Sequence, residues 1–82
     1  MSRLEVPNRD LSIALFVRDR RRAAGLTQAD LATLAGVGKR FLVELEDGKA
    51  TLRLDKVERV LRAFGKRLGP VDAPREREAE AL

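Results

Sequence analysis

Apolar residues recur at helical spacing along most of the chain, and strand-like alternation is nearly absent. Each helical stretch ends at a glycine, which favours the left-handed backbone that stops a helix. The pattern predicts four helices: from about Asn8–Leu11 to Ala24, from Thr27 to Gly36, from Gly38 or Lys39 to Asp47, and from Leu54 to about Gly65. An all-α, compact domain of four to five helices follows from this pattern.

The second predicted helix has the strongest local start signal. Thr27 is a good N-cap, and Asp30 three residues later completes a Thr-x-x-Asp capping box. Leu31, Leu34 and Ala35 then follow at the spacing of one helix face. These signals predict that the second helix begins directly after Thr27. For the first helix, Asn8 and Asp10 are acceptable caps.

The last predicted helix continues into a short extended segment. Its apolar stripe runs through Leu54, Val57, Leu61, Phe64 and Leu68. Residues 66–71 are predicted to form a short strand, which Pro70 restricts to the edge of a sheet. The folded domain is therefore expected to span residues 1–71, and residues 72–82 are expected to form a mobile charged tail.

Composition removes most catalytic chemistry from consideration. The chain has 82 residues, no Cys and no His, so it offers neither a thiolate nor an imidazole as nucleophile, base or metal ligand. No spacing of carboxylates suggests an acid–base pair. The sequence therefore predicts a single small domain that is not an enzyme and holds no metal or cofactor.

Charge is unevenly distributed along the chain. Counting Lys and Arg against Asp and Glu gives +6 for residues 1–69 and −2 for residues 70–82. A basic body fits a polyanion such as DNA. A solvated surface with some excess arginine explains the same count equally well.

The longest apolar stretch, Leu11–Val17, is much shorter than a membrane-spanning helix, which needs about 20 apolar residues. A cytoplasmic protein with no membrane partner is therefore expected.

Two short helices joined by Gly36, Val37 and Gly38 form the arrangement of a helix-turn-helix. The small residues Ala32 and Gly36 allow the two helices to cross closely. In this motif the second helix enters a major groove about 12 Å wide, and the first lies across the phosphate backbone. The pattern thus indicates DNA binding.

Three short segments resemble a known family: residues 25–32 (GLTQADLA), 35–37 (AGV) and 46–49 (EDGK). At this spacing they resemble the XRE, or phage Cro/repressor-like, helix-turn-helix family. Residues 40–51, with Leu54–Val57, are similar to the branch of HipB-like antitoxins, which are encoded beside HipA-like kinase toxins. The resemblance implies a lambda repressor-like fold and a homodimer that binds a palindromic operator in double-stranded DNA. A HipA-like toxin is then a further possible partner.

The resemblance also assigns DNA-binding roles along the motif. The positions concerned are Thr27, Gln28, Gly38, Lys39, Arg40, Val43, Glu44, Lys49 and Arg53. Lys39 and Arg40 have the chemistry to donate to guanine, and Glu44 to accept from cytosine. Gly38 stands where the family usually has Ser or Thr, so the third helix has no side-chain cap.

Several of these positions have a second interpretation. Thr27 is explained by capping alone, whereas Gln28 matches a phosphate contact of the family. Lys39 and Glu44 are also explained as a surface pair, and Val43 either touches a thymine methyl or packs inside. Residues 49–53 either hold phosphate or form a solvated loop.

Two further sets have structural roles by the same resemblance. Arg21 and Glu46 match an ion pair common in the family. In the HipB-like branch the segment after the fourth helix is a strand that pairs with its copy in a dimer. That dimerisation set comprises Phe64, Lys66, Arg67, Leu68 and Val71.

These observations favour a sequence-specific DNA-binding transcriptional repressor, in the form of a HipB-like antitoxin that regulates its own operon. A stand-alone XRE-family regulator is the alternative within this class. A protein-interaction module that keeps the fold without binding DNA is the alternative from another class.

Overall fold

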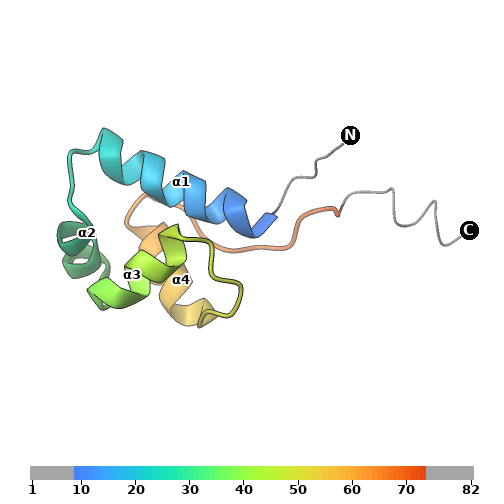
Figure 1. Ribbon diagram of the computed structural model, residues 1–82. Coiled ribbons are helices and arrows are strands. Elements are labelled where there is room, and N and C mark those ends of the chain that lie inside the picture. The colour runs from blue at the N-terminus through green and yellow to red at the C-terminus, as the bar shows by residue number, and fades with distance from the viewer. Residues whose placement is uncertain (1–8, 74–82) are drawn as a thin grey trace, which may run out of the picture.

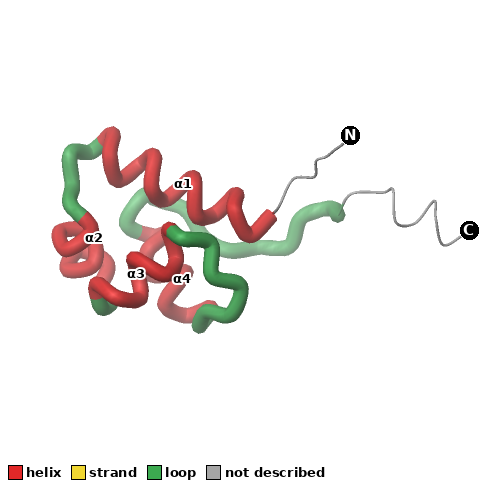
Figure 2. Tube along the Cα trace, in the orientation of Figure 1, coloured by secondary structure: helices red, strands yellow, loops and turns green. Residues whose placement is uncertain are grey.

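The computed structural model describes residues 9–73, with side chains from Ile13 onward. It contains four helices, α1 (Arg9–Ala23), α2 (Gln28–Ala35), α3 (Lys39–Glu46) and α4 (Leu54–Arg62), which are joined by loops (Figures 1 and 2). The all-α prediction is confirmed for this part of the chain. A fifth helix is not found within residues 9–73, and the predicted cap Asn8 lies outside them.

The helices enclose one small apolar core. The long helix α1 runs across the domain above α2, α3 and α4 (Figure 1). α3 packs against both α1 and α2, and α2 also packs against α4. The largest fully buried side chains are Val17, Leu31, Leu42 and Val60, one from each helix. Each helix therefore contributes an anchor to the same core, and this fixes the mutual orientation of α2 and α3.

The start and end of α2 follow the predicted signals. The Thr27 hydroxyl accepts a hydrogen bond from the Asp30 N–H, and the Asp30 carboxylate accepts one from the Thr27 N–H, both at 3.0 Å. The hydrogen bond from the Thr27 backbone lowers the pKa of Asp30. Gly36 adopts φ +74°, a left-handed conformation that favours glycine and ends the helix. The predicted capping box is confirmed.

Replacing Thr27 with alanine should lower the free energy of unfolding by about 1 kcal/mol, because the Asp30 N–H loses its acceptor. Urea unfolding followed by far-UV circular dichroism measures the loss. Thr33→Ala is the matched control, since Thr33 is exposed within the same helix. Equal effects of the two substitutions would contradict the capping role.

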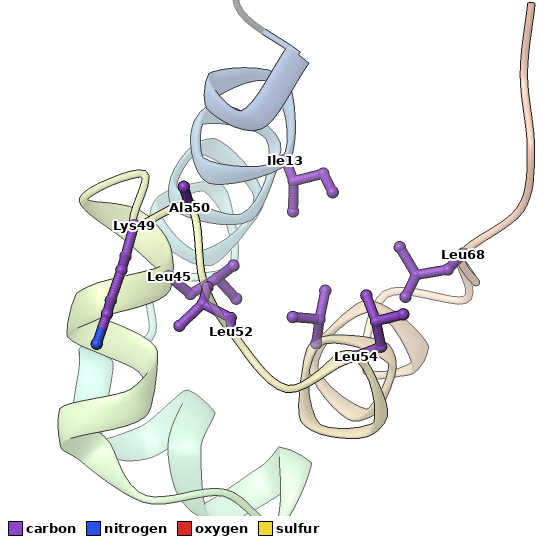
Figure 3. A pocket seen from close by; sticks show the side chains of 8 residues that line it. Ile13, Leu45, Lys49, Ala50, Leu52, Leu54 and Leu68 are labelled. Atoms are coloured by element: carbon purple, nitrogen blue, oxygen red, sulfur yellow. The ribbon is translucent and has the colours of Figure 1, made fainter.

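Two leucines of the predicted apolar patterns are exposed. Leu34 is 67% exposed and Leu54 is 70% exposed. α2 turns Leu31 and Ala32 inward, which places Leu34 at the solvent side of the helix. Leu54 opens α4 at the rim of an apolar pocket that Ile13, Leu52 and Leu68 also line (Figure 3). The apolar spacing of Leu34 and Leu54 therefore does not place them in the core.

The segment after α4 is a loop and not the predicted strand. Gly65 adopts φ +73°, and the Lys66 N–H bonds back to the Leu61 carbonyl at 3.0 Å, which closes the helix end. No strand occurs within residues 9–73, so the backbone of residues 66–71 has no neighbouring strand to pair with. The segment returns beneath α1 (Figure 1), and Leu68 packs against the core.

Most of the predicted tail lies outside residues 9–73. Asp72 and Ala73 are exposed, and residues 74–82 lie outside the described part of the chain. Within the described part, no helix combines the length and the apolar character that crossing a membrane requires.

Candidate nucleic-acid interface

Helix α3 has a buried side and an outward side. Leu42 and Leu45 are buried in the core, whereas Lys39 and Arg40 are exposed at the first turn. The Arg40 side chain is 92% exposed. Val43 and Glu44 are half-buried, between the core side and the exposed side of α3. Lys39, Arg40, Val43 and Glu44 thus lie on the side of α3 that is not packed in the core.

The opposite end of α3 is anchored by a buried ion pair. Arg21 donates from Nε to Glu46 Oε2 at 2.7 Å and from Nη2 to Glu46 Oε1 at 3.0 Å. The two side chains are only 12% and 3% exposed. A two-pronged contact of this kind fixes both distance and orientation. The structure thus brings together the two residues that the family resemblance pairs.

Further hydrogen bonds extend this pair into a network across three helices. Gln28 Nε2 donates to Glu46 Oε1 at 3.1 Å, and Arg18 Nη2 donates to the Glu46 carbonyl at 3.3 Å. Arg21 Nη1 donates to the Leu26 carbonyl at 2.9 Å. The network therefore links α1, the start of α2 and the end of α3.

The environment of Glu46 has opposing effects on its ionisation. Burial by itself raises the pKa of the Glu46 carboxyl, but hydrogen bonds from Arg21 and Gln28 outweigh it and hold the pKa below its usual range. The same hydrogen bond raises the pKa of Arg21. Both groups are therefore charged at neutral pH.

Glu46 competes with phosphate for the Gln28 side chain, which is predicted to contact DNA. Its side-chain amide faces Glu46 and is half-buried. A DNA phosphate would have to use the remaining N–H of the amide or draw the side chain outward. The phosphate role of Gln28 stays a prediction, and its structural role is the one shown by the contacts.

Sequence reasoning missed two arginines that support the motif. Arg18 lies three residues before Arg21 on α1, and this helical spacing was a signal that the two share a face. Arg59 of α4 donates from Nη1 to the Gly36 carbonyl at 3.2 Å, at the turn between α2 and α3. Nothing local in the sequence identifies the acceptor of Arg59.

Glu44 pairs with two cations of the surface. Its Oε2 lies 3.7 Å from Arg40 Nε, one helical turn away, and its Oε1 lies 3.5 Å from Lys49 Nζ. Among the described side chains, Glu44 thus pairs with these residues and not with Lys39. The expected pair of Lys39 with Glu44 is replaced by two others: Arg40 lies one helical turn from Glu44 and faces it, and Lys49 approaches Glu44 from the loop after α3.

The loop cation Arg53 also has a partner within the chain. Its Nη2 and Nε contact the two oxygens of Asp55 at 2.7 and 3.1 Å. This contact lowers the pKa of Asp55. Both side chains are exposed, so a phosphate has access to compete for Arg53, and its role as a phosphate clamp stays a prediction.

The predicted dimerisation residues divide into two groups. Phe64 packs edge-on against Phe16 at a ring separation of 6.2 Å, and Leu68 is half-buried. Lys66 and Arg67 are exposed beside an apolar depression, and Val71 is 81% exposed. Phe64 and Leu68 therefore stabilise the single chain, whereas Val71 makes no core contact.

The chain matches a known family over most of its length. The family model described as a helix-turn-helix domain matches residues 12–81. The protein therefore belongs to the helix-turn-helix domain family, in its XRE-like form.

Two relatives of this chain are named as HTH-type transcriptional regulators. The chain is 47% identical over 53 residues to the uncharacterized HTH-type transcriptional regulator y4mF of Sinorhizobium fredii, a match that covers 65% of this chain and 70% of the relative. It is 36% identical over 51 residues to an uncharacterized HTH-type transcriptional regulator of Methanothermobacter thermautotrophicus, covering 62% and 74%.

Proposed function

We propose that this protein is a sequence-specific DNA-binding transcriptional repressor. The observation that carries the proposal is the exposed pair Lys39 and Arg40 at the start of α3, a helix whose other side is buried and whose far end is anchored through Glu46. Long cationic side chains on a helix held in a fixed orientation suit recognition of guanine in a major groove. The names of both relatives as transcriptional regulators support this class of function.

The remaining candidate residues fit a phosphate-binding role around this helix. In a helix-turn-helix, α2 lies across the backbone and its first N–H groups face phosphate. Lys49 and Arg53 lie in the loop after α3, and the exposure of both side chains supports a phosphate-binding role. Gly38 begins α3 without a side chain, which allows close approach of the duplex.

Binding to a selected duplex tests the function directly. Sites enriched from a pool of randomised duplexes should bind more tightly than a scrambled duplex in fluorescence anisotropy. Affinity should fall steeply with salt, because several phosphates are contacted. A protein that enriches no sequence and binds no duplex would reject this function in favour of an interaction module without DNA.

We further propose that the active form is a homodimer on a palindromic operator. Two copies would place their α3 helices about 34–36 Å apart, one turn of duplex. The proposed contact surface is the dimerisation set, Phe64, Lys66, Arg67, Leu68 and Val71. Its support is the open apolar pocket beside Leu68, in which Ile13 and Leu54 are also accessible (Figure 3).

Val71→Asp should shift the protein from dimer to monomer in sedimentation equilibrium, because it places a charge in the proposed contact without removing a core residue. Truncation after Gly65 should do the same, with circular dichroism reporting whether the shortened chain stays folded. Asp72→Ala, at the neighbouring exposed position, serves as the control. An unchanged dimer in both variants would reject this surface.

Within this class we propose a HipB-like antitoxin that regulates its own operon and binds a HipA-like kinase toxin. The run of residues 40–51 supports this form through its resemblance to that branch. The stand-alone regulator is the second candidate, and the names of the two relatives favour it. A kinase-like reading frame beside the gene, whose product co-purifies with this protein, would support the antitoxin; its absence would favour the stand-alone regulator.

A further inference from the structure

The carboxylate of Glu44 lies between two cations that the proposed function assigns to DNA. Glu44 is 31% exposed, so it is partly held against the protein, whereas Arg40 is 92% and Lys49 is 47% exposed. One oxygen faces Arg40 Nε at 3.7 Å and the other faces Lys49 Nζ at 3.5 Å. Glu44 therefore has one cationic neighbour for each of its oxygens.

This arrangement places a negative charge inside the surface that a duplex would approach. Every duplex presents phosphates, and a carboxylate near them is repulsive whatever the base sequence. While Arg40 and Lys49 face Glu44, they are also partly neutralised for phosphate contacts. Both pairs are long and solvent-accessible, so each cation is readily released when a better acceptor is offered.

A guanine in the right position is such an acceptor for Arg40. Its O6 and N7 atoms together accept two hydrogen bonds from one guanidinium, which a lone phosphate oxygen does not match in geometry. Arg40 must leave Glu44 to make this contact, so the pair opposes binding to a target site at least as much as binding to unrelated DNA. The same carboxylate thus weakens binding to all DNA.

Direct base reading by Glu44 agrees less well with these contacts. A cytosine N4–H₂ group would have to displace Arg40 or Lys49 from the oxygen that it approaches. The displaced cation would lose its partner in the same step. The cations and the cytosine therefore compete for the carboxylate.

We propose that Glu44 limits the affinity of α3 for DNA of any sequence, because it pairs with Arg40 and Lys49 and repels phosphate, and that it does not itself read a base. This proposal rests on the proposed function as a DNA-binding repressor. It assigns Glu44 a positioning and repulsive role in place of the cytosine contact suggested by the family resemblance.

The test compares Glu44→Gln with a matched control, Glu58→Gln. Glu58 also forms a pair one helical turn apart, with Arg62 at 3.7 Å, and is 28% exposed, but it lies on α4. The two variants therefore change the net charge equally and break similar pairs. Anisotropy is measured on a scrambled duplex and on a site enriched by the wild-type protein, across a range of salt concentrations.

Glu44→Gln should bind the scrambled duplex about threefold to tenfold more tightly than wild type. Its gain on the enriched site should be at least as large, so that binding tightens without loss of the preferred bases. Its salt dependence should steepen by about one released counterion. Glu58→Gln should change the scrambled-duplex affinity less than about twofold.

Three results would overturn the proposal. Equal gains for the two variants would show an effect of net charge alone. A Glu44→Gln variant that enriches a different base at one position, without tighter scrambled-duplex binding, would identify Glu44 as a base reader. A wild-type protein that enriches no site would reject the proposed function together with this inference, whereas the first two results leave that function intact.

Discussion

Replacing Glu46 with glutamine is expected to lower the free energy of unfolding by about 3 kcal/mol at neutral pH. The substitution preserves shape but removes the negative charge that Arg21 contacts at 2.7 and 3.0 Å, where the two side chains are only 12% and 3% exposed. The arginine is then left buried beside a neutral amide. Since a domain of this size has a total stability of about 4–12 kcal/mol, the loss is a large share of it. Urea unfolding followed by circular dichroism measures the loss.

The exposed pair of Glu58 and Arg62 provides the control for this prediction. Its charged atoms lie 3.7 Å apart, and the Arg62 side chain is 71% exposed. Glu58→Gln should therefore cost less than about 0.5 kcal/mol. A loss below about 1 kcal/mol for Glu46→Gln would show that the buried pair does not hold the domain together.

The same pair should make stability depend on pH in the acid range. The folded-state pKa of Glu46 lies below its unfolded value, so the stabilisation is complete above the unfolded pKa of about 4.3 and is lost as the pH falls through the folded pKa. The difference in stability between wild type and Glu46→Gln should then be constant from about pH 6 to 8 and shrink below about pH 4. Taking this difference cancels the titration of the other carboxylates.

Replacing Arg40 with alanine is expected to weaken binding to an enriched site about 5-fold to 150-fold, which corresponds to about 1–3 kcal/mol. The Arg40 side chain is 92% exposed and makes no core contact, so the fold should remain intact. Binding to a scrambled duplex should change much less, because only the enriched site offers the guanine that Arg40 contacts.

Arg62→Ala is the matched control for Arg40→Ala. Arg62 also pairs with a glutamate one turn away at 3.7 Å and is 71% exposed, but it belongs to α4. It should therefore affect the enriched and scrambled duplexes equally and only slightly. If Arg40→Ala weakened both duplexes by the same factor, Arg40 would be a phosphate contact and not a base reader.

Features encoded by local chemistry were predictable from the sequence. The capping box of Thr27 and Asp30 involves residues three apart, and Gly36 ends α2 through its own backbone preference. Both depend on the chain within a single turn. The pairing of Arg21 with Glu46, across 25 positions, was inferred from family resemblance and not from local chemistry.

Features that depend on distant partners were not predictable in the same way. The amide of Gln28 faces Glu46, and Arg59 reaches the Gly36 carbonyl, because the tertiary fold brings these acceptors close. Leu34 shares the helix-face spacing of Leu31 and yet is exposed, because α2 is too short for its pattern to fix the centre of the buried face. The strand expected at residues 66–71 needs a second backbone, which the single chain does not supply.

The division of labour along α3 has a consequence for redesign. This helix has eight residues. Its last residue, Glu46, is held by Arg21, whereas Lys39 and Arg40 in its first turn are exposed to solvent. Orientation and selectivity are thereby assigned to opposite ends of one short element. New operator preferences should consequently be obtainable by randomising positions 39 and 40, with 21 and 46 kept constant, at little cost to thermal tolerance.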